Sequence, residues 1–162
     1  MHSKIFQIGS KPIKKVDYSC PEDYYDVCDD FADYIGDEVT GEDRKDTINS
    51  LAEMLKDVFD RVGSGVFAYK GEDSLRKFKQ AWADELRRQA GSLSSDNLFQ
   101  NQRLYLLRAA TEETHLRSSF RVDIVGWTGG TAYSFGELFE YAASELKEGD
   151  RIYVGAVIDF HY

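Results

Sequence analysis

The sequence predicts a single α+β domain over residues 1–162, in which a small mixed β-sheet of about four strands carries helices mainly on one face. Three observations lead to this expectation. The chain has 162 residues, of which 42% are hydrophobic and 14% aromatic, enough apolar material for one core. Apolar residues alternate in some segments and recur every three or four residues in others. No low-complexity tract or linker divides the chain.

The first third is expected to contain one strand and two helices. Residues 4–16 are predicted to hold the strand, residues 21–35 a first helix and residues 40–62 a second helix. Pro21 suits the first turn of the first helix, because its fixed φ is helical and its missing N–H is not needed there. The apolar residues of that helix recur at the spacing of one buried stripe: Tyr24, Val27, Cys28, Phe31 and Ile35.

The middle of the chain continues this alternation of elements. The sequence predicts a short strand over residues 66–70 and a helix over residues 72–91, which closes near a glycine. Residues 94–113 are expected to be helical, although residues 103–107 fit an extended strand equally well.

The last third predicts a βαβ unit. A strand over residues 120–124 is followed by the glycine turn 126–130. Ser134 and Glu137 form a capping box for a helix that extends to Leu146, and a strong final strand covers residues 152–160. A strand, a helix and a strand over about 40 residues predict two parallel strands joined by a right-handed crossover.

Formal net charge is −9, and the negative charge is concentrated early in the chain. Residues 17–46 hold 12 acidic residues against Arg44 and Lys45, a net charge of −10, which leaves the rest of the chain at +1. This balance disfavours direct binding to nucleic acid or anionic lipid, because both associations draw on clustered lysine and arginine. The lack of a long apolar run and of a signal-peptide pattern predicts a cytoplasmic protein without a membrane span.

Eight acidic residues on the outer faces of the two predicted early helices are the candidate partner-binding residues: Glu22, Asp26, Asp30, Asp33, Asp37, Glu42, Asp46 and Glu53. Like charges at helical spacing oppose folding, and no lysine stands four residues after any of them to relieve the repulsion. If the helices form a hairpin, their two rows would present about one charge per 3 Å, within a factor of two of duplex DNA. The alternatives are a solvated face that keeps the protein dispersed, and a cation site.

Catalytic and metal-binding patterns are weak in this sequence. Cys20 and Cys28 are too few for a disulfide framework and do not have the spacing of a zinc site, so we expect reduced thiols, no metal and no cofactor. Asp159 and His161 stand two residues apart on the final predicted strand and would share a face. With the glycine turn 126–130 they define an alternative interpretation, a small enzyme or ligand-binding domain at the carboxyl ends of the last two strands.

The uneven charge resembles that of small acidic antagonists, such as phage-encoded DNA mimics, anti-restriction and anti-CRISPR proteins, and immunity proteins that block nuclease toxins. The resemblance is one of charge pattern and size. It implies a non-enzymatic protein that occupies the basic surface of a nuclease or of another nucleic-acid-binding protein. A third possibility is a structural subunit of a larger assembly, which an exposed apolar patch would indicate.

Overall fold

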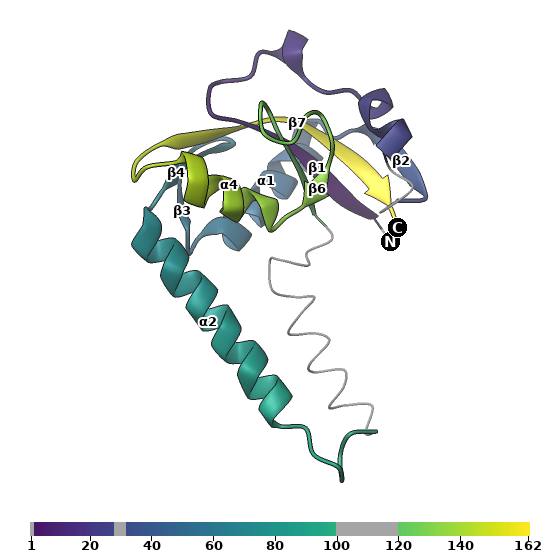
Figure 1. Cartoon of the computed structure of the whole chain (residues 1–162). Helices are drawn as coiled ribbons and strands as arrows, with labels where there is room; N and C mark the ends of the chain where they lie inside the picture. Colours follow the sequence, from purple (N-terminus) through teal and green to yellow (C-terminus); the bar gives the residue numbers. More distant parts are fainter. Residues whose placement is uncertain (1, 28–31, 100–119) are drawn as a thin grey trace.

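Seven strands form one mixed sheet in the computed structural model, which describes residues 2–27, 32–99 and 120–162 (Figure 1). The strands are β1 (His2–Gly9), β2 (Tyr34–Glu38), β3 (Phe59–Gly63), β4 (Val66–Tyr69), β5 (Arg121–Ile124), β6 (Tyr133–Ser134) and β7 (Arg151–His161). The helices are α1 (Gly41–Leu55), α2 (Glu72–Gly91) and α4 (Glu137–Glu145), together with two short 3-10 helices, η1 (Lys15–Asp17) and η2 (Pro21–Val27). The predicted α+β class is confirmed, and none of the described helices is long and apolar enough to cross a membrane.

β1 and β7 form the centre of the sheet, whose strand order is β3-β4-β7-β1-β5-β6. They run antiparallel from the pair His2↔His161 to the pair Gly9↔Tyr153, and β5 lies parallel to β1 on its other edge. The 11-residue β7 is long enough to take two neighbours on its second edge, with β4 along its first half and β2 along its last. Most residues of both central strands are buried, and β7 has a long apolar stretch because it is covered on both faces.

The three α-helices of the described residues cover one face of the sheet (Figure 1). Phe6 and Ile8 of β1 face this side and meet buried side chains of α1, α2 and α4 in the larger core cluster. α1 contributes Ile48, Leu51 and Leu55, which recur at helical spacing and so form one apolar stripe. In Figure 1, α2 extends beyond the sheet, so most of its length lies away from this core.

The second face is covered by the chain between β1 and β2, which includes η1 and η2 (Figure 1). Ile5 of β1 and Ile158 and Phe160 of β7 point to this side. They pack against Tyr24 of η2 and Ile35 of β2 in a smaller core cluster. The sheet therefore has two separate cores, one made with helices and one made with an irregular segment.

Asp123 of β5 is a buried carboxylate that ties this covering segment to the sheet. Only 4% of the residue is exposed. Tyr24 and Thr128 donate hydroxyl hydrogen bonds of 3.0 and 2.7 Å to it, and Ser19 donates a longer one of 3.4 Å. Burial and the charge of Asp123 raise the pKa of Tyr24, so the phenol keeps its proton and remains a donor.

A β-bulge at Gly155 connects the centre of the sheet to α1. The register between β1 and β7 shifts there, which leaves backbone groups of β7 without their usual partners. The side chain of Gln7 accepts a hydrogen bond of 3.0 Å from the N–H of Ala156, and Arg44 of α1 donates one of 2.6 Å to the carbonyl of Gly155. A Cβ at position 155 would lie 2.4 Å from the Gln7 Oε1 atom, so the bulge requires glycine.

The predicted first helix over residues 21–35 is wrong. Its first part is the 3-10 helix η2 and its last part begins β2. Tyr24 and Ile35 are buried as expected, but they reach the second face of the sheet from separate elements. Cys28 and Phe31 of the predicted stripe lie outside the described residues. The open edge of β7 explains the difference, because β2 satisfies its backbone hydrogen-bonding groups there.

The predicted second helix ends earlier than expected. α1 ends at Leu55, and the segment that continues the helical pattern forms β3 instead. β3 pairs with β4 across Ser64-Gly65, and Gly65 adopts a φ of 70°, which suits a two-residue hairpin turn. The glycine-rich sequence therefore turns a hairpin and does not end a helix. β2 and β3 together account for two of the strands beyond the expected four.

The predicted βαβ unit is also wrong, because β5 and β7 are neither adjacent nor parallel. Both pair with β1, β5 in the parallel and β7 in the antiparallel direction. α4 begins at Glu137 after Gly136, without a side-chain cap, and Ser134 lies in β6, so the predicted capping box does not form. β7 pairs with β1 over most of its length, and β5 pairs with the other edge of β1. β1, which is buried on both faces, therefore lies between the two strands.

Several predicted elements are confirmed. These are the strands expected within residues 4–16 and over residues 66–70, 120–124 and 152–160, and the helix over residues 72–91. Most of the helix predicted over residues 94–113 lies outside the described residues.

Candidate functional site

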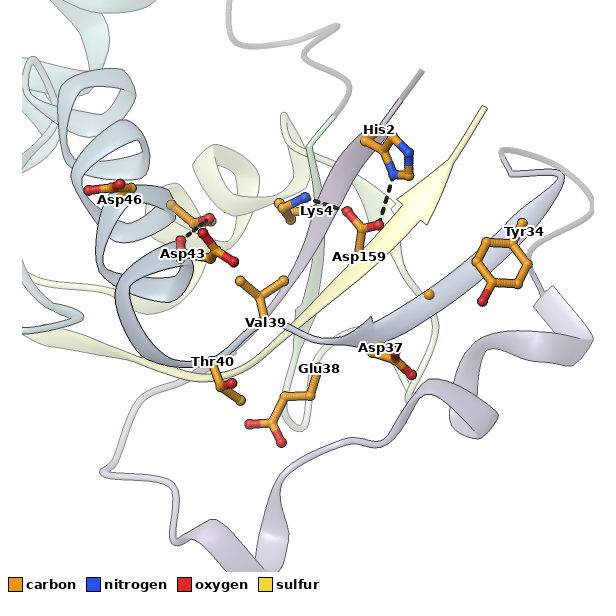
Figure 2. Close-up of a pocket in the computed structure, with 12 residues that line it drawn as sticks. His2, Lys4, Tyr34, Asp37, Glu38, Val39, Thr40, Asp43, Asp46 and Asp159 are labelled. Carbon is orange, nitrogen blue, oxygen red and sulfur yellow. Dashed lines mark hydrogen bonds and ion pairs between the residues drawn. The ribbon is translucent and has the colours of Figure 1, made fainter.

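A groove of about 670 Å³ lies beside α1, where the sheet continues past the helix (Figure 2). Its floor is polar and comes from three neighbouring strands: Lys4 of β1, Gly36 of β2 and Asp159 of β7. Lys4 and Asp159 lie on the same face of the sheet as the larger core cluster, so the floor is the polar continuation of that apolar surface. The fold thus leaves one end of the helix-covered face open.

The two walls of the groove are acidic (Figure 2). α1 supplies Asp43 and Asp46 from its first two turns. β2 supplies Asp37 and Glu38 on the other side, with Tyr34 toward the far end. The residue that connects the walls, Val39, is fixed by a backbone hydrogen bond of 2.7 Å to the carbonyl of Val157.

Gly36 allows β2 to lie close to the floor of the groove. The register between β2 and β7 shifts after Ile35, which marks a bulge at Gly36 and Asp37. A Cβ at position 36 would lie 3.1 Å from the Asp159 Oδ2 atom, so a larger residue would push β2 away from the floor.

The charge of the floor is neutralised within the protein. The Lys4 ammonium donates a hydrogen bond to Asp159 Oδ1, and Asp159 Oδ2 lies 2.9 Å from His2 Nδ1. Burial raises the pKa of Asp159, but the hydrogen bonds from Lys4 and His2 outweigh it and hold the pKa below its ordinary value. Lys4 and His2 therefore hold the Asp159 side chain in place as part of the groove floor.

The charge of the walls is only partly neutralised. Lys15 donates to both carboxylate oxygens of Glu38, at 2.6 and 2.9 Å. Asp37, Asp43 and Asp46 are exposed, and none of them forms an ion pair with another residue in the part of the chain that the structure describes. With five lining carboxylates against Lys4, and His2 neutral, the groove has a formal charge of −4.

Of the eight predicted partner-binding residues, only Asp37 and Asp46 line this groove. The seven that fall within the described residues are all exposed, as a contact surface requires. Asp30 lies outside those residues. Since the first predicted helix does not form, the expected pair of parallel acidic rows does not exist.

The other described members of the set lie on η2, directly before β2 and on α1. Glu22 and Asp26 lie on η2. Asp33 precedes β2 and lies 2.7 Å from His161 Nδ1. Glu42 and Glu53 of α1 pair with lysines three residues further on, at 3.1 and 3.3 Å. The repulsion expected along this helix is thus partly relieved by its own lysines at a spacing of three residues.

The sequence reasoning missed four ionisable residues of the groove: His2, Lys4, Glu38 and Asp43. Alternation along the first strand places His2 and Lys4 on one face, and that signal was present in the sequence. β2 itself was not predicted, because its first two residues were assigned to a helix, although its Asp37 was among the expected contacts. Only the pairing of β2 with β7 brings its acids opposite those of α1.

The alternative site, built from the glycine turn and the last strand, does not assemble. The turn follows β5, whose Ile124 pairs with Ile8, whereas His161 of β7 pairs with His2 at the other end of β1. The two halves of this site therefore lie at opposite ends of the sheet. Trp127 of the turn donates a hydrogen bond of 2.7 Å to Glu137, which joins the turn to the start of α4.

The remaining chemistry-bearing groups that the structure describes are not grouped as a metal site, and Cys20 is not activated. Cys20 is exposed, and its hydrogen bond to Glu22 and its partial burial raise the pKa of the thiol, which disfavours the reactive thiolate. Cys28 lies outside the described residues. Within residues 2–27, 32–99 and 120–162, no three histidine, cysteine or acidic side chains are grouped as metal ligands.

No known family model, curated protein or solved structure matches the chain.

Proposed function

We propose that this chain is a non-enzymatic binding protein that occupies a basic, nucleic-acid-binding surface of a partner protein, with the groove between α1 and β2 as its contact face. The observation that carries the proposal is the set of three exposed carboxylates without an ion pair among the described residues, Asp37, Asp43 and Asp46, that line a hollow of about 670 Å³. By blocking a nuclease, a restriction enzyme or a CRISPR effector, such a protein would act as an inhibitor or an immunity protein.

The unpaired carboxylates of the walls supply the electrostatic part of the argument. Asp37 of β2 and Asp43 and Asp46 of α1 line the hollow, so carboxylate-bearing residues lie on both sides of it (Figure 2). Charges of one sign around a concave surface focus the field and speed the approach of a partner of opposite charge. Lysine and arginine side chains of a partner would complete the ion pairs that the chain itself leaves unmade.

Two exposed tyrosines, Tyr34 of the groove lining and Tyr25 of η2, supply a second kind of contact. Tyr34 is 60% exposed and Tyr25 is 51% exposed. Slight burial and the charge of Glu22 raise the pKa of Tyr25, with smaller effects from Tyr34 and Asp37, so the two rings share one negative environment. Tyrosine is enriched at protein interfaces, and its ring face attracts guanidinium groups.

The proposal differs in form from duplex mimicry by two helical rows. That form required a continuous double row of carboxylates on two neighbouring α-helices. Of the two predicted helices, only the second forms an α-helix, α1. The support that remains is local charge in one groove and the uneven charge of the whole chain.

A competition experiment tests the proposal. Proteins retained from the native host by the immobilised chain at low salt, and released at high salt, would be identified and purified. We expect the purified partner to bind nucleic acid and the chain to displace that nucleic acid. The triple variant Asp37→Asn, Asp43→Asn, Asp46→Asn is expected to lose the displacement, because it removes the unpaired charges of the groove.

A matched control is available on the same chain. The triple variant Asp57→Asn, Asp96→Asn, Glu145→Gln changes the net charge from −9 to −6, as the groove variant does, but alters exposed acids elsewhere. We expect the control to compete as well as the wild type. Equal competition by the groove variant, or retention that salt does not weaken, would refute the proposed function.

A further inference from the structure

Three strands meet at residue 161, at the open end of the groove. His161 of β7 pairs with His2 of β1 on one side and with Tyr34 of β2 on the other. The backbone N–H of Asp33 also donates a hydrogen bond of 3.0 Å to the carbonyl of His161. The start of β2 is therefore attached to the end of β7 at this point.

Two histidine–carboxylate pairs lie side by side at this junction. His161 Nδ1 lies 2.7 Å from Asp33 Oδ1, and His2 Nδ1 lies 2.9 Å from Asp159 Oδ2. The two imidazole rings meet edge to face, with centroids 5.3 Å apart. Each ring thus has its own carboxylate, Asp33 just before β2 and Asp159 on β7.

Other charged and titratable groups surround the junction from each strand. Lys4 of β1 binds Asp159 together with His2, and Tyr34 of β2 pairs with His161 in the sheet. Asp43 and Asp46 of α1 face the groove from its far wall.

The charge of the Asp33–His161 pair changes within a narrow range of pH. The hydrogen bond from His161 lowers the pKa of Asp33, so this carboxylate stays ionised well into acid. An imidazole gains and loses its proton between about pH 5 and pH 8. Opposite charges face each other while the imidazole is protonated, and they are lost when the pH falls through the lowered pKa of Asp33.

We propose that Asp33 and His161 form a proton-operated clasp, which holds the start of β2 on β7 while the imidazole is protonated and loosens it when the proton leaves. β2 carries Tyr34, Asp37 and Glu38, so the clasp fixes one wall of the groove. The clasp does not depend on what the groove binds. Because both side chains are partly exposed, its effect is local, a few-fold change in the opening of β2.

Amide hydrogen exchange, followed residue by residue by NMR on the full chain, tests this inference. The amide of Asp33 lies at the clasp, whereas the amide of Val39 bonds to Val157 at the other end of β2 and serves as an internal reference. After correction for intrinsic exchange, we expect the protection of Asp33 relative to Val39 to fall about threefold from pH 5.5 to pH 8.

Three variants separate the clasp from a general effect of charge. Asp33→Asn and His161→Gln keep polar side chains but remove the ionic pair, and each is expected to abolish the change with pH. Asp37→Asn removes the same charge from the same strand and is expected to keep it. The inference is overturned if wild-type protection at Asp33 does not change with pH, or if Asp33→Asn and Asp37→Asn behave alike.

Discussion

At the scale of single residues, the buried carboxylate of Asp123 decides how the second face of the sheet is covered. It accepts hydroxyl hydrogen bonds from η2 and from the loop after β5, and it has almost no access to water. A buried carboxylate is tolerated only where such donors replace its hydration. The irregular segment between β1 and β2 is therefore fixed by a specific polar contact as well as by apolar packing.

Replacement of Asp123 should destabilise the protein more than replacement of one of its donors. We expect Asp123→Ala to lower the free energy of unfolding by about 2–4 kcal/mol, because three hydroxyl groups lose their acceptor. Tyr24→Phe should cost about 1–2 kcal/mol, since it removes one donor and leaves the others. Urea denaturation measures both. Equal losses for the two variants would contradict the central role of the carboxylate.

The bulge in β7 gives a second prediction at this scale. We expect Gly155→Ala to lower the free energy of unfolding by about 1–3 kcal/mol, because its Cβ would meet Gln7 Oε1 and Ile13 Cδ1 at 2.4 and 2.8 Å. Gly91→Ala is the matched control: it lies at the end of α2, and an added Cβ meets nothing within 4 Å. Thermal unfolding should show no loss for this control, since alanine favours a helix over glycine.

At the scale of elements, local sequence predicts those whose environment is uniform along their length. α2 forms the helix that its apolar spacing predicts, because it is a single amphipathic helix with most of its length exposed. β1 and β7 follow theirs because their apolar residues allow burial on both faces. In these elements the local preference and the tertiary environment agree.

The segments before β2 and after α1 were mispredicted because a tertiary pairing overrides a local period. Tyr24 and Ile35 fit one helical stripe, yet the length of β7 offers a sheet edge that β2 occupies. The sequence did carry a hint, since the long final strand predicted over residues 152–160 needs partners along both edges. Which segment supplies those partners is set by long-range contacts, which periodicity does not record.

The floor of the groove joins β1 to β7 and gives a prediction about pH. The pKa of Asp159 is lowered in the folded protein, so this group contributes stability above its unfolded pKa and loses it as the pH falls through the folded pKa. We therefore expect Asp159→Asn to lose less stability than the wild type between about pH 5 and about pH 2. Urea denaturation across this range, with Asp57→Asn as the exposed control, provides the measurement. Parallel pH profiles for Asp159→Asn and the wild type would contradict it.

At the scale of the whole molecule, the fold converts an uneven charge along the sequence into one acidic groove. The sequence located the negative region correctly at residues 17–46, but it did not place the charges relative to one another. Asp37 and Asp46 lie on opposite sides of the groove only because β2 pairs with β7 and α1 packs beside it. Lys4 and His2 join them from β1, more than 30 residues earlier in the chain. Such a site can be described only once the topology is known.

The central claim is that positive charge from a partner docks in this groove, and one titration tests it directly. A hexa-arginine peptide would be added to the ¹⁵N-labelled full chain at low salt, and the amide shifts would be mapped along the sequence. We expect shifts concentrated at residues 34–47 and 2–4, weakened by salt, lost in the groove triple variant and kept in the Asp57/Asp96/Glu145 control. Shifts spread evenly over the exposed acids of α2 and α4, or unchanged in the groove variant, would contradict the account.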